Sequence, residues 1–207
     1  MKYIFVVVAP GSKWSSTELN TYWSPSIDQT DYSEDRTYYH DATGEMMLMH
    51  IGAYFDPGME FGDFFDEFED YTKEQCEAEF DRPFSGNGIR IIKSHVLSNK
   101  IDLLRERWPD CPIVTVHRPN DACLGWWVKC GEFYITYPTY HDYYENLPKM
   151  AKIIVKQNEG ICEALYKYPS LYVKDNLSLA KNLGLEPPPE EYYQNYQISD
   201  IDVRVIK

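Results

Sequence analysis

Tyr3-Ile-Phe-Val-Val-Val-Ala9, followed by Pro10-Gly-Ser-Lys-Trp-Ser-Ser-Thr17, is the stretch of sequence that decides the fold. Its first seven residues are apolar and mostly β-branched, a pattern typical of a strand buried on both faces of a parallel sheet. Pro10 and Gly11 are a turn signal, and the hydroxyl residues from Ser15 onward favour the start of a helix. The stretch therefore predicts a buried strand, a polar loop and a helix in succession.

Two more buried strands are predicted further along the chain, over residues 89–94 (Ile-Arg-Ile-Ile-Lys-Ser) and 112–117 (Pro-Ile-Val-Thr-Val-His). A helix is predicted after each of them, the first over 98–108. The second runs from Pro119 to about Gly131, since proline is favoured in the first turn of a helix. Strands that alternate with helices indicate an α/β fold with a central parallel sheet flanked by helices.

The remaining elements are assigned from periodicity and turn signals. Phenylalanines recur at spacings of three and four from Phe61 to Phe68, which predicts an amphipathic helix there. The other expected elements are an irregular loop over 24–45, a helix from a capping box at Thr72 to about Phe80, a long helix over 143–166, a short strand over 170–173, a helix over 175–183 and an edge strand over 201–205.

Length and composition narrow the class of protein. The 207 residues predict one domain spanning 1–207, and 20 Lys and Arg against 33 Asp and Glu give a net charge of −13. A chain this acidic is not expected to bind a nucleic-acid backbone or an anionic membrane. The apolar run at 4–9 is too short to span a membrane and lacks the layout of a secretory signal, so we expect a cytoplasmic protein. The five scattered cysteines form no C-x-x-C pair and are expected to be reduced thiols.

The loop after the first strand is the first candidate binding site. A strand, a loop and a helix start together present backbone N–H groups and the positive end of the helix dipole to a ligand. Lys13 adds a positive charge, and Ser12, Ser15 and Ser16 add hydroxyl donors. This combination suits a phosphate or sulfate group, although it matches neither the Walker A pattern nor the dinucleotide pattern G-x-G-x-x-G. An ordinary turn with a helix cap would carry the same residues.

Polar residues also follow the second and third predicted strands. His95 ends the run Lys93-Ser94-His95 and is suited to act as a general base, since the pKa of histidine is ordinarily near neutrality. Arg118 follows the third strand, and its guanidinium can bind a phosphate with two hydrogen bonds. Ligands of open α/β sheets bind at the carboxyl ends of the strands, so we expect these residues to meet the loop at one edge. Taken singly, His95 could cap the next loop and Arg118 could pair with Asp121.

The order of these elements resembles the sulfotransferase family. The matching stretches are Pro10-Gly-Ser-Lys-Trp-Ser-Ser16, Ile91-Ile-Lys-Ser-His95, Ile113-Val-Thr-Val-His-Arg-Pro-Asn-Asp121, Leu171-Tyr-Val-Lys-Asp-Asn-Leu177 and Leu179-Ala-Lys-Asn-Leu-Gly-Leu185. They are similar to the family's phosphate loop, its Lys-Thr-His-like element, its Arg-Asn-Pro-x-Asp element, its Tyr-Glu-Asp-Leu segment and its Leu-Gly-Leu helix end. The resemblance spans nearly the whole chain and extends to short sulfotransferase-like proteins of marine cyanobacterial viruses. It implies a three-layer fold of the P-loop type.

The resemblance also implies a reaction and a role for each matching residue. Sulfotransferases transfer a sulfuryl group from 3′-phosphoadenosine 5′-phosphosulfate to an acceptor hydroxyl on a small molecule, a glycan or a peptide, without a metal. By position, Lys13 would contact the bridging oxygen and the 5′-phosphate, and Arg118 would bind the 3′-phosphate. His95 would deprotonate the acceptor, with Lys93 in support. The phosphosulfate would be wrapped by the loop residues Gly11, Ser12, Lys13, Trp14, Ser15, Ser16 and Thr17.

Departures from the family pattern keep two alternatives open. Gly11 directly follows Pro10, so the lysine comes later than in the family. Gly125 or Trp126 stands where the family has a serine that helps to hold the 3′-phosphate, and the family's C-terminal Arg-Lys-Gly-x-x-Gly element is absent. One alternative is a relative that binds a nucleotide or phosphate without transfer. The other is a kinase-type P-loop phosphotransferase, against which Arg118 counts, because it stands where an acid that holds Mg²⁺ would be expected.

Overall fold

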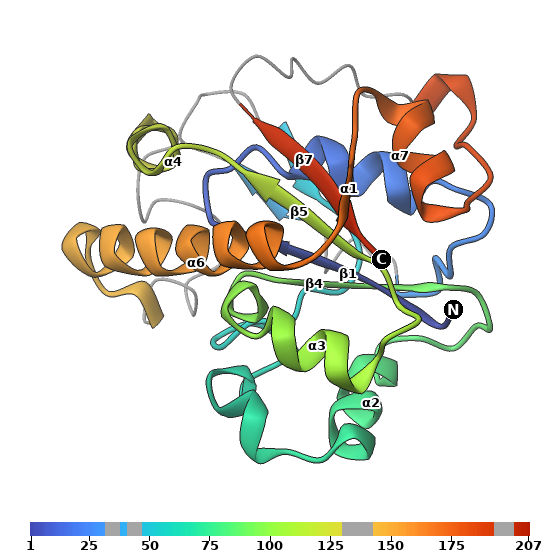
Figure 1. The fold of residues 1–207 in the computed structure, drawn as a ribbon, viewed down its shortest axis with the longest axis horizontal. Helices are drawn as coiled ribbons and strands as arrows, with labels where there is room; N and C mark the ends of the chain where they lie inside the picture. The colour runs from blue at the N-terminus through green and yellow to red at the C-terminus, as the bar shows by residue number, and fades with distance from the viewer. Residues whose placement is uncertain (32–37, 41–46, 130–142, 193–200) are drawn as a thin grey trace.

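The computed structural model describes residues 1–31, 38–40, 47–129, 143–192 and 201–207, and Figure 1 shows how their helices and strands are arranged. A five-stranded sheet forms the centre, in the order β4-β1-β5-β7-β6. Its strands are β1 (Tyr3–Val8), β4 (Arg90–Ser94), β5 (Ile113–His117), β6 (Ser170–Tyr172) and β7 (Asp202–Ile206). A separate two-stranded sheet pairs β2 (Tyr38–His40) with β3 (Met47–His50).

Helices alternate with most of these strands, as expected of an α/β chain. The α-helices are α1 (Ser15–Tyr22), α2 (Lys73–Asp81), α3 (Ile101–Arg107), α4 (Asn120–Lys129), α6 (Leu147–Lys167) and α7 (Asn176–Leu183). Short 3₁₀ helices are η2 (Phe65–Asp70), η3 (Val96–Asn99) and η4 (Glu190–Tyr192). The predicted α/β class is confirmed.

The three strands that carry the candidate site run parallel. Val7 of β1 lies beside Ser94 of β4, and Val8 lies beside Val116 of β5. The prediction of a central parallel sheet holds for these three strands, but the sheet as a whole is mixed, because β7 runs antiparallel to β5 and β6 runs antiparallel to β7. The amino-acid composition of a strand does not determine whether it pairs in a parallel or an antiparallel direction. The sequence of β7 therefore does not predict its direction.

The last strand, predicted over 201–205 as an edge strand, instead lies inside the sheet. β7 pairs with β5 on one side and with β6 on the other. Its alternating pattern places two polar side chains on one face, and these two bond to each other. The guanidinium of Arg204 donates to the carboxylate of Asp202 at 2.7 Å, and both remain partly buried between neighbouring strands.

The core is divided between the two faces of the sheet, with helices against each face (Figure 1). Ile4, Val6 and Val8 of β1 belong to the cluster that includes residues of α1 and α7. Tyr3 and Phe5 alternate with them and belong to the cluster that includes residues of α2 and α3. Every residue of β1 is buried, which explains why its sequence is apolar throughout rather than alternating.

The segment over 61–68 is the main local correction. Its phenylalanines are buried as expected at Phe65 and Phe68, but they sit on the 3₁₀ helix η2 and not on an α-helix. Gly62 has φ +81° and Glu67 has non-helical φ and ψ, so a regular helix cannot run through the segment. The capping box at Thr72 is confirmed: its hydroxyl accepts from the backbone of Gln75, and Gln75 bonds back to Thr72.

Two other boundaries differ from the predictions. The expected irregular loop over 24–45 contains β2, and residues 32–37 and 41–46 lie outside the described part of the chain. The long helix α6 begins at Leu147 and not near 143. Asn146 caps it by accepting from Lys149, and Pro148 occupies the first turn, where its missing N–H costs nothing.

Candidate functional site

The loop between β1 and α1 is held in a tight, left-handed conformation. Gly11 has φ +77° and Lys13 has φ 61°, and the N–H of Ser12 donates to the carbonyl of Ala9 at 3.2 Å. A Cβ atom at Gly11 would lie 2.3 Å from the backbone oxygen of Cys123 on α4. Position 11 therefore requires glycine for two reasons: its positive φ and the close approach of α4.

Two hydroxyl groups of this loop region are buried without a hydrogen-bond partner among the described residues. They belong to Ser12 and Thr17, whose side chains are fully buried. A buried hydroxyl without a partner is destabilising, and such groups in native proteins call for an explanation. The first N–H groups of α1 likewise have no acceptor within the helix. The donors suit an anion that enters the loop from the edge of the sheet.

The other predicted loop residues take different positions. Lys13 and Ser15 are partly buried, and Trp14 is 5% exposed. Ser16 lies in the first turn of α1, and its side chain lies outside the described part of the structure. The loop therefore presents hydroxyls, backbone and one lysine, as the sequence predicts, together with one bulky ring that turns inward.

The predicted convergence of three strand ends is confirmed by their contacts. The Nδ1 atom of His95, just after β4, lies 2.8 Å from the carbonyl oxygen of Val8 at the end of β1. The guanidinium of Arg118, just after β5, donates to the carbonyl of Gly11 at 2.9 Å. Adjacent parallel strands end at the same edge, so Val8 and His95, 87 positions apart, and Gly11 and Arg118, 107 positions apart, become neighbours.

The protonation state of His95 follows from its surroundings. A carbonyl oxygen can only accept, so Nδ1 carries the proton that points at Val8, and in the neutral ring Nε2 keeps its lone pair. His95 is 3% exposed, and burial lowers its pKa to about 3, against a smaller opposing effect of the bond to Val8. The imidazole is therefore neutral over the physiological range of pH.

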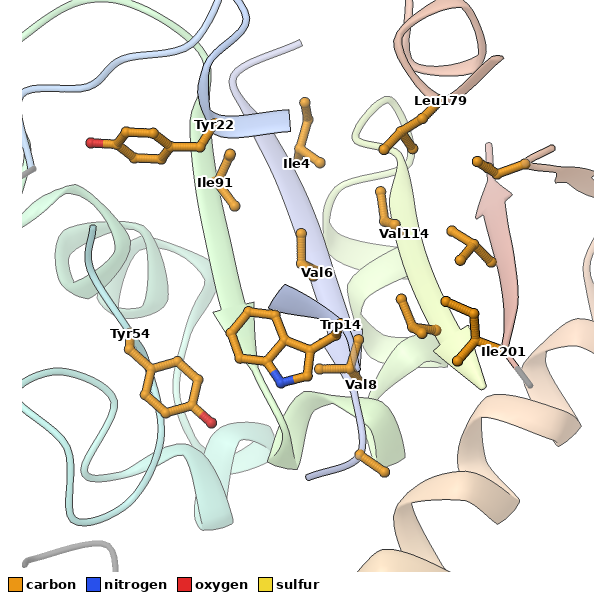
Figure 2. Close-up of a cluster of buried hydrophobic side chains, with 14 of the residues drawn as sticks. Ile4, Val6, Val8, Trp14, Tyr22, Tyr54, Ile91, Val114, Leu179 and Ile201 are labelled. Atoms are coloured by element: carbon orange, nitrogen blue, oxygen red, sulfur yellow. The ribbon is translucent and has the colours of Figure 1, made fainter. Parts of the chain in front are cut away.

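Two aromatic rings cover His95. The ring of Trp14 meets the imidazole edge-on with centroids 5.8 Å apart, and the ring of Tyr54 does so at 5.5 Å. The two rings themselves are near parallel, 18° apart, with centroids separated by 6.0 Å. Figure 2 shows Trp14 from the loop and Tyr54 from the neighbouring segment lying beside each other. Trp14 thus belongs both to the loop and to the enclosure of the histidine.

Lys93 points into the protein and pairs with a carboxylate. Its Nζ atom lies 3.1 Å from Glu18 of α1 and also contacts the carbonyl of Ile51. Both charged side chains are almost wholly buried. Burial raises the pKa of Glu18, and the nearby ammonium of Lys93 works against that rise. The pair joins α1, the helix that follows the loop, to β4, the strand just before His95, so Lys93 acts as a link between them.

Arg118 is tied to two helices as well as to the loop. Its side chain holds the carbonyl of Gly11, and its own carbonyl accepts from the amide of Asn158 on α6 at 2.8 Å. The same amide group of Asn158 donates to Asn120 at the start of α4. Gly125, further along α4, is exposed and has open space around it, so a serine side chain would fit there without a clash.

Asp56 is a residue of the site that the sequence did not reveal. Its carboxylate accepts from the hydroxyl of Ser94 at 2.7 Å and from the backbone N–H of His95 at 2.9 Å. Desolvation raises its pKa to about 7, against the opposing effect of these bonds and of Tyr54. The signal lay in the run from Ile51 to Phe55, an apolar stretch that ends in a carboxylate just before a Pro-Gly turn.

Comparisons with protein-family models, with curated proteins and with solved structures found no match to this chain. Within the described residues, His, Cys, Asp and Glu side chains form no group of three or more that could hold a metal ion. Over the same parts of the chain, no helix is long and apolar enough to cross a lipid bilayer.

Proposed function

We propose that this protein is a sulfotransferase-like enzyme with a three-layer fold of the P-loop type. It would transfer a sulfuryl group from 3′-phosphoadenosine 5′-phosphosulfate to an acceptor hydroxyl. One observation carries the proposal. Among the described residues, the buried hydroxyls of Ser12 in the loop after β1 and of Thr17 in the first turn of α1 have no hydrogen-bond partner, and a neutral histidine bonded to the last residue of β1 lies at the same sheet edge. An anion site and a proton acceptor at one edge suit group transfer from an anionic donor.

The residues present fit the phosphosulfate end of such a donor. The hydroxyls of Ser12 and Thr17 offer hydrogen bonds that the protein itself leaves unmade among its described residues. Lys13 and the start of α1 add positive charge where the negative charge of the departing phosphate grows. The fit to a 3′-phosphate rests on Arg118, because a guanidinium is always charged and its planar N–H fork matches a phosphate.

The chemistry assigned to the protein's own residues is proton transfer and charge stabilisation. The donor, when bound, supplies the activated sulfuryl group. Nε2 of His95 accepts the proton of the acceptor hydroxyl as its oxygen forms the new bond to sulfur. The bond from sulfur to the phosphate oxygen breaks, and the electron pair leaves with the phosphate. Trp14 or Tyr54 must move aside for the acceptor. Once the imidazole of His95 is no longer enclosed, its pKa rises again, because burial is what lowers it.

The same enclosure favours a second candidate, a nucleotide- or phosphate-binding relative without transfer. His95 is covered by two rings, and Lys93 is engaged with Glu18. Neither observation bears on binding by the anion loop, our name for residues 11–17, which are proposed to hold the phosphosulfate. The two candidates therefore agree on binding and differ on turnover.

The experiment that tests the proposal is calorimetric titration with 3′-phosphoadenosine 5′-phosphate. Adenosine 5′-phosphate and ATP with Mg²⁺ serve as comparison ligands. We expect binding that weakens at least tenfold when the 3′-phosphate is missing, roughly the effect of one lost charge-assisted contact. Incubation with ³⁵S-labelled donor and a panel of phenols, sugars and peptides then separates transfer from binding alone. Binding of ATP with Mg²⁺ alone would overturn the proposal in favour of a kinase-type enzyme, and binding of no ligand would remove both candidates.

A further inference from the structure

The carboxylate of Asp56 lies where β4 turns into η3, and it collects donors from three consecutive residues. The hydroxyl of Ser94 donates to it at 2.7 Å, the backbone N–H of His95 at 2.9 Å and that of Val96 at 3.2 Å. Asp56 is 1% exposed, so no water competes for these bonds. The carboxylate therefore determines where the chain bends after the strand.

His95 is anchored from both ends as a result. Its backbone N–H is held by Asp56, and its carbonyl accepts from the hydroxyl of Ser98 at 2.6 Å. Its ring is held through Nδ1 by the carbonyl of Val8. The direction in which Nε2 points depends on both anchors, because a shift of the backbone at residue 95 would swing the ring away from Val8.

Asp56 also holds one of the rings that enclose the histidine. The hydroxyl of Tyr54 bonds to its carboxylate, and the ring of Tyr54 lies edge-on to the imidazole at 5.5 Å. One carboxylate thus fixes the candidate base and a wall of its enclosure together.

We propose that Asp56 is a positioning residue that orients the imidazole of His95 for proton transfer. The inference rests on the proposed function, in which His95 is the base. Asp56 touches no reacting atom itself and acts through the backbone of His95 and through Tyr54. Its removal should loosen the bond between Nδ1 of His95 and Val8 while the anion loop keeps its shape.

The test compares Asp56→Ala and Asp56→Asn with the wild-type full chain by NMR. The readouts are the ¹⁵N shifts of the His95 ring and the exchange rate of its Nδ1 proton, assigned by their loss in His95→Gln. We expect exchange to be at least tenfold faster in Asp56→Ala, the effect of about one lost hydrogen bond. Asp56→Asn keeps one acceptor oxygen and should fall between the two, which also preserves the test if the alanine variant does not fold.

Asp31→Asn is the matched control. Asp31 is also a buried carboxylate, and it accepts from the backbone of Ala53 and the hydroxyl of Tyr22. The Asp31→Asn variant should be less stable than the wild type, and its His95 signals should be unchanged. Unchanged signals in both Asp56 variants, or equal changes in Asp31→Asn, would overturn the inference. Titration of all variants with 3′-phosphoadenosine 5′-phosphate keeps the two proposals apart. Its failure with the wild type counts against the proposed function and leaves the NMR result standing.

Discussion

The Nδ1 atom of His95 donates its hydrogen bond to the carbonyl of Val8, the residue from which the anion loop departs. The backbone that leads into the loop thereby also sets the tautomer of the candidate base. The binding proposed for the loop and the proton transfer proposed for the histidine would therefore both depend on one short piece of β1, although the two groups are far apart in the sequence.

His95→Ala should abolish sulfuryl transfer and leave the affinity for 3′-phosphoadenosine 5′-phosphate within about twofold of the wild type. The reason is that the ring supplies the lone pair on Nε2, whereas the anion contacts come from the loop. Turnover with labelled donor and calorimetric titration measure the two quantities separately. Retained turnover would remove His95 as the base.

Lys13→Ala should weaken binding of 3′-phosphoadenosine 5′-phosphate about tenfold, because a charge-assisted contact to phosphate is lost. The measurement is calorimetric titration at fixed ionic strength. Lys2→Ala is the control, since Lys2 pairs with Asp81 at 2.7 Å beside the start of β1, at the opposite edge of the sheet. Equal losses in the two variants would mean that only overall charge matters.

Gly11→Ala should lower the free energy of unfolding by about 2–4 kcal/mol, because the new Cβ both occupies a left-handed position and meets the backbone of Cys123. Gly184→Ala separates these two causes. Gly184 has φ +73° but open space around it, so only the dihedral term of about 1–2 kcal/mol should remain. Urea denaturation checks both values, and similar losses would show that the contact with α4 contributes nothing.

The stability of the wild type relative to Asp56→Asn should fall as pH rises from 4 to 8. The pKa of Asp56 is about 7 in the folded protein, well above its ordinary value near 3.8, so the folded state binds the proton more tightly. The stability that the protonated Asp56 contributes is fully present below pH 4 and is lost as pH rises through 7. Its size is on the order of 4 kcal/mol.

Urea denaturation of both proteins at pH 4.5, 6 and 8 measures this difference. His95 acts in the opposite direction, because its lowered pKa makes the folded state lose stability as pH falls from about 6.5 toward 3. That contribution is present in both proteins and cancels in the comparison. A difference that stays constant with pH would contradict the raised pKa of Asp56.

Much of the site framework could be predicted because it depends on local patterns. The apolar run at 3–9 predicts β1. The residues that follow each of the parallel strands must then meet at one edge of the sheet. His95 and Arg118 were found in this way. What they contact there, Val8 and the carbonyl of Gly11, depends on backbone geometry that no residue pattern records.

The rest of the site depends on contacts between distant segments. Asp56 and Tyr54 come from a stretch that runs beside β4, where the N–H of Phe55 donates to the carbonyl of Lys93 at 3.0 Å. Nothing in the local sequence near residue 56 indicates that pairing. Likewise, the sequence places a lysine at position 93, where a lysine of the site is expected. Only the structure shows that this lysine is buried and forms an ion pair with Glu18.

Within the described part of the chain, β6 is a short edge strand of the five-stranded sheet. The strand is only three residues long, and its exposed side chains include Leu171 and Tyr172. A short edge offers few backbone groups on which another molecule could add a strand. With a net charge of −13 the molecules also repel one another, so concentrated preparations should resist aggregation through this edge at low salt and lose part of that protection as salt screens the charge.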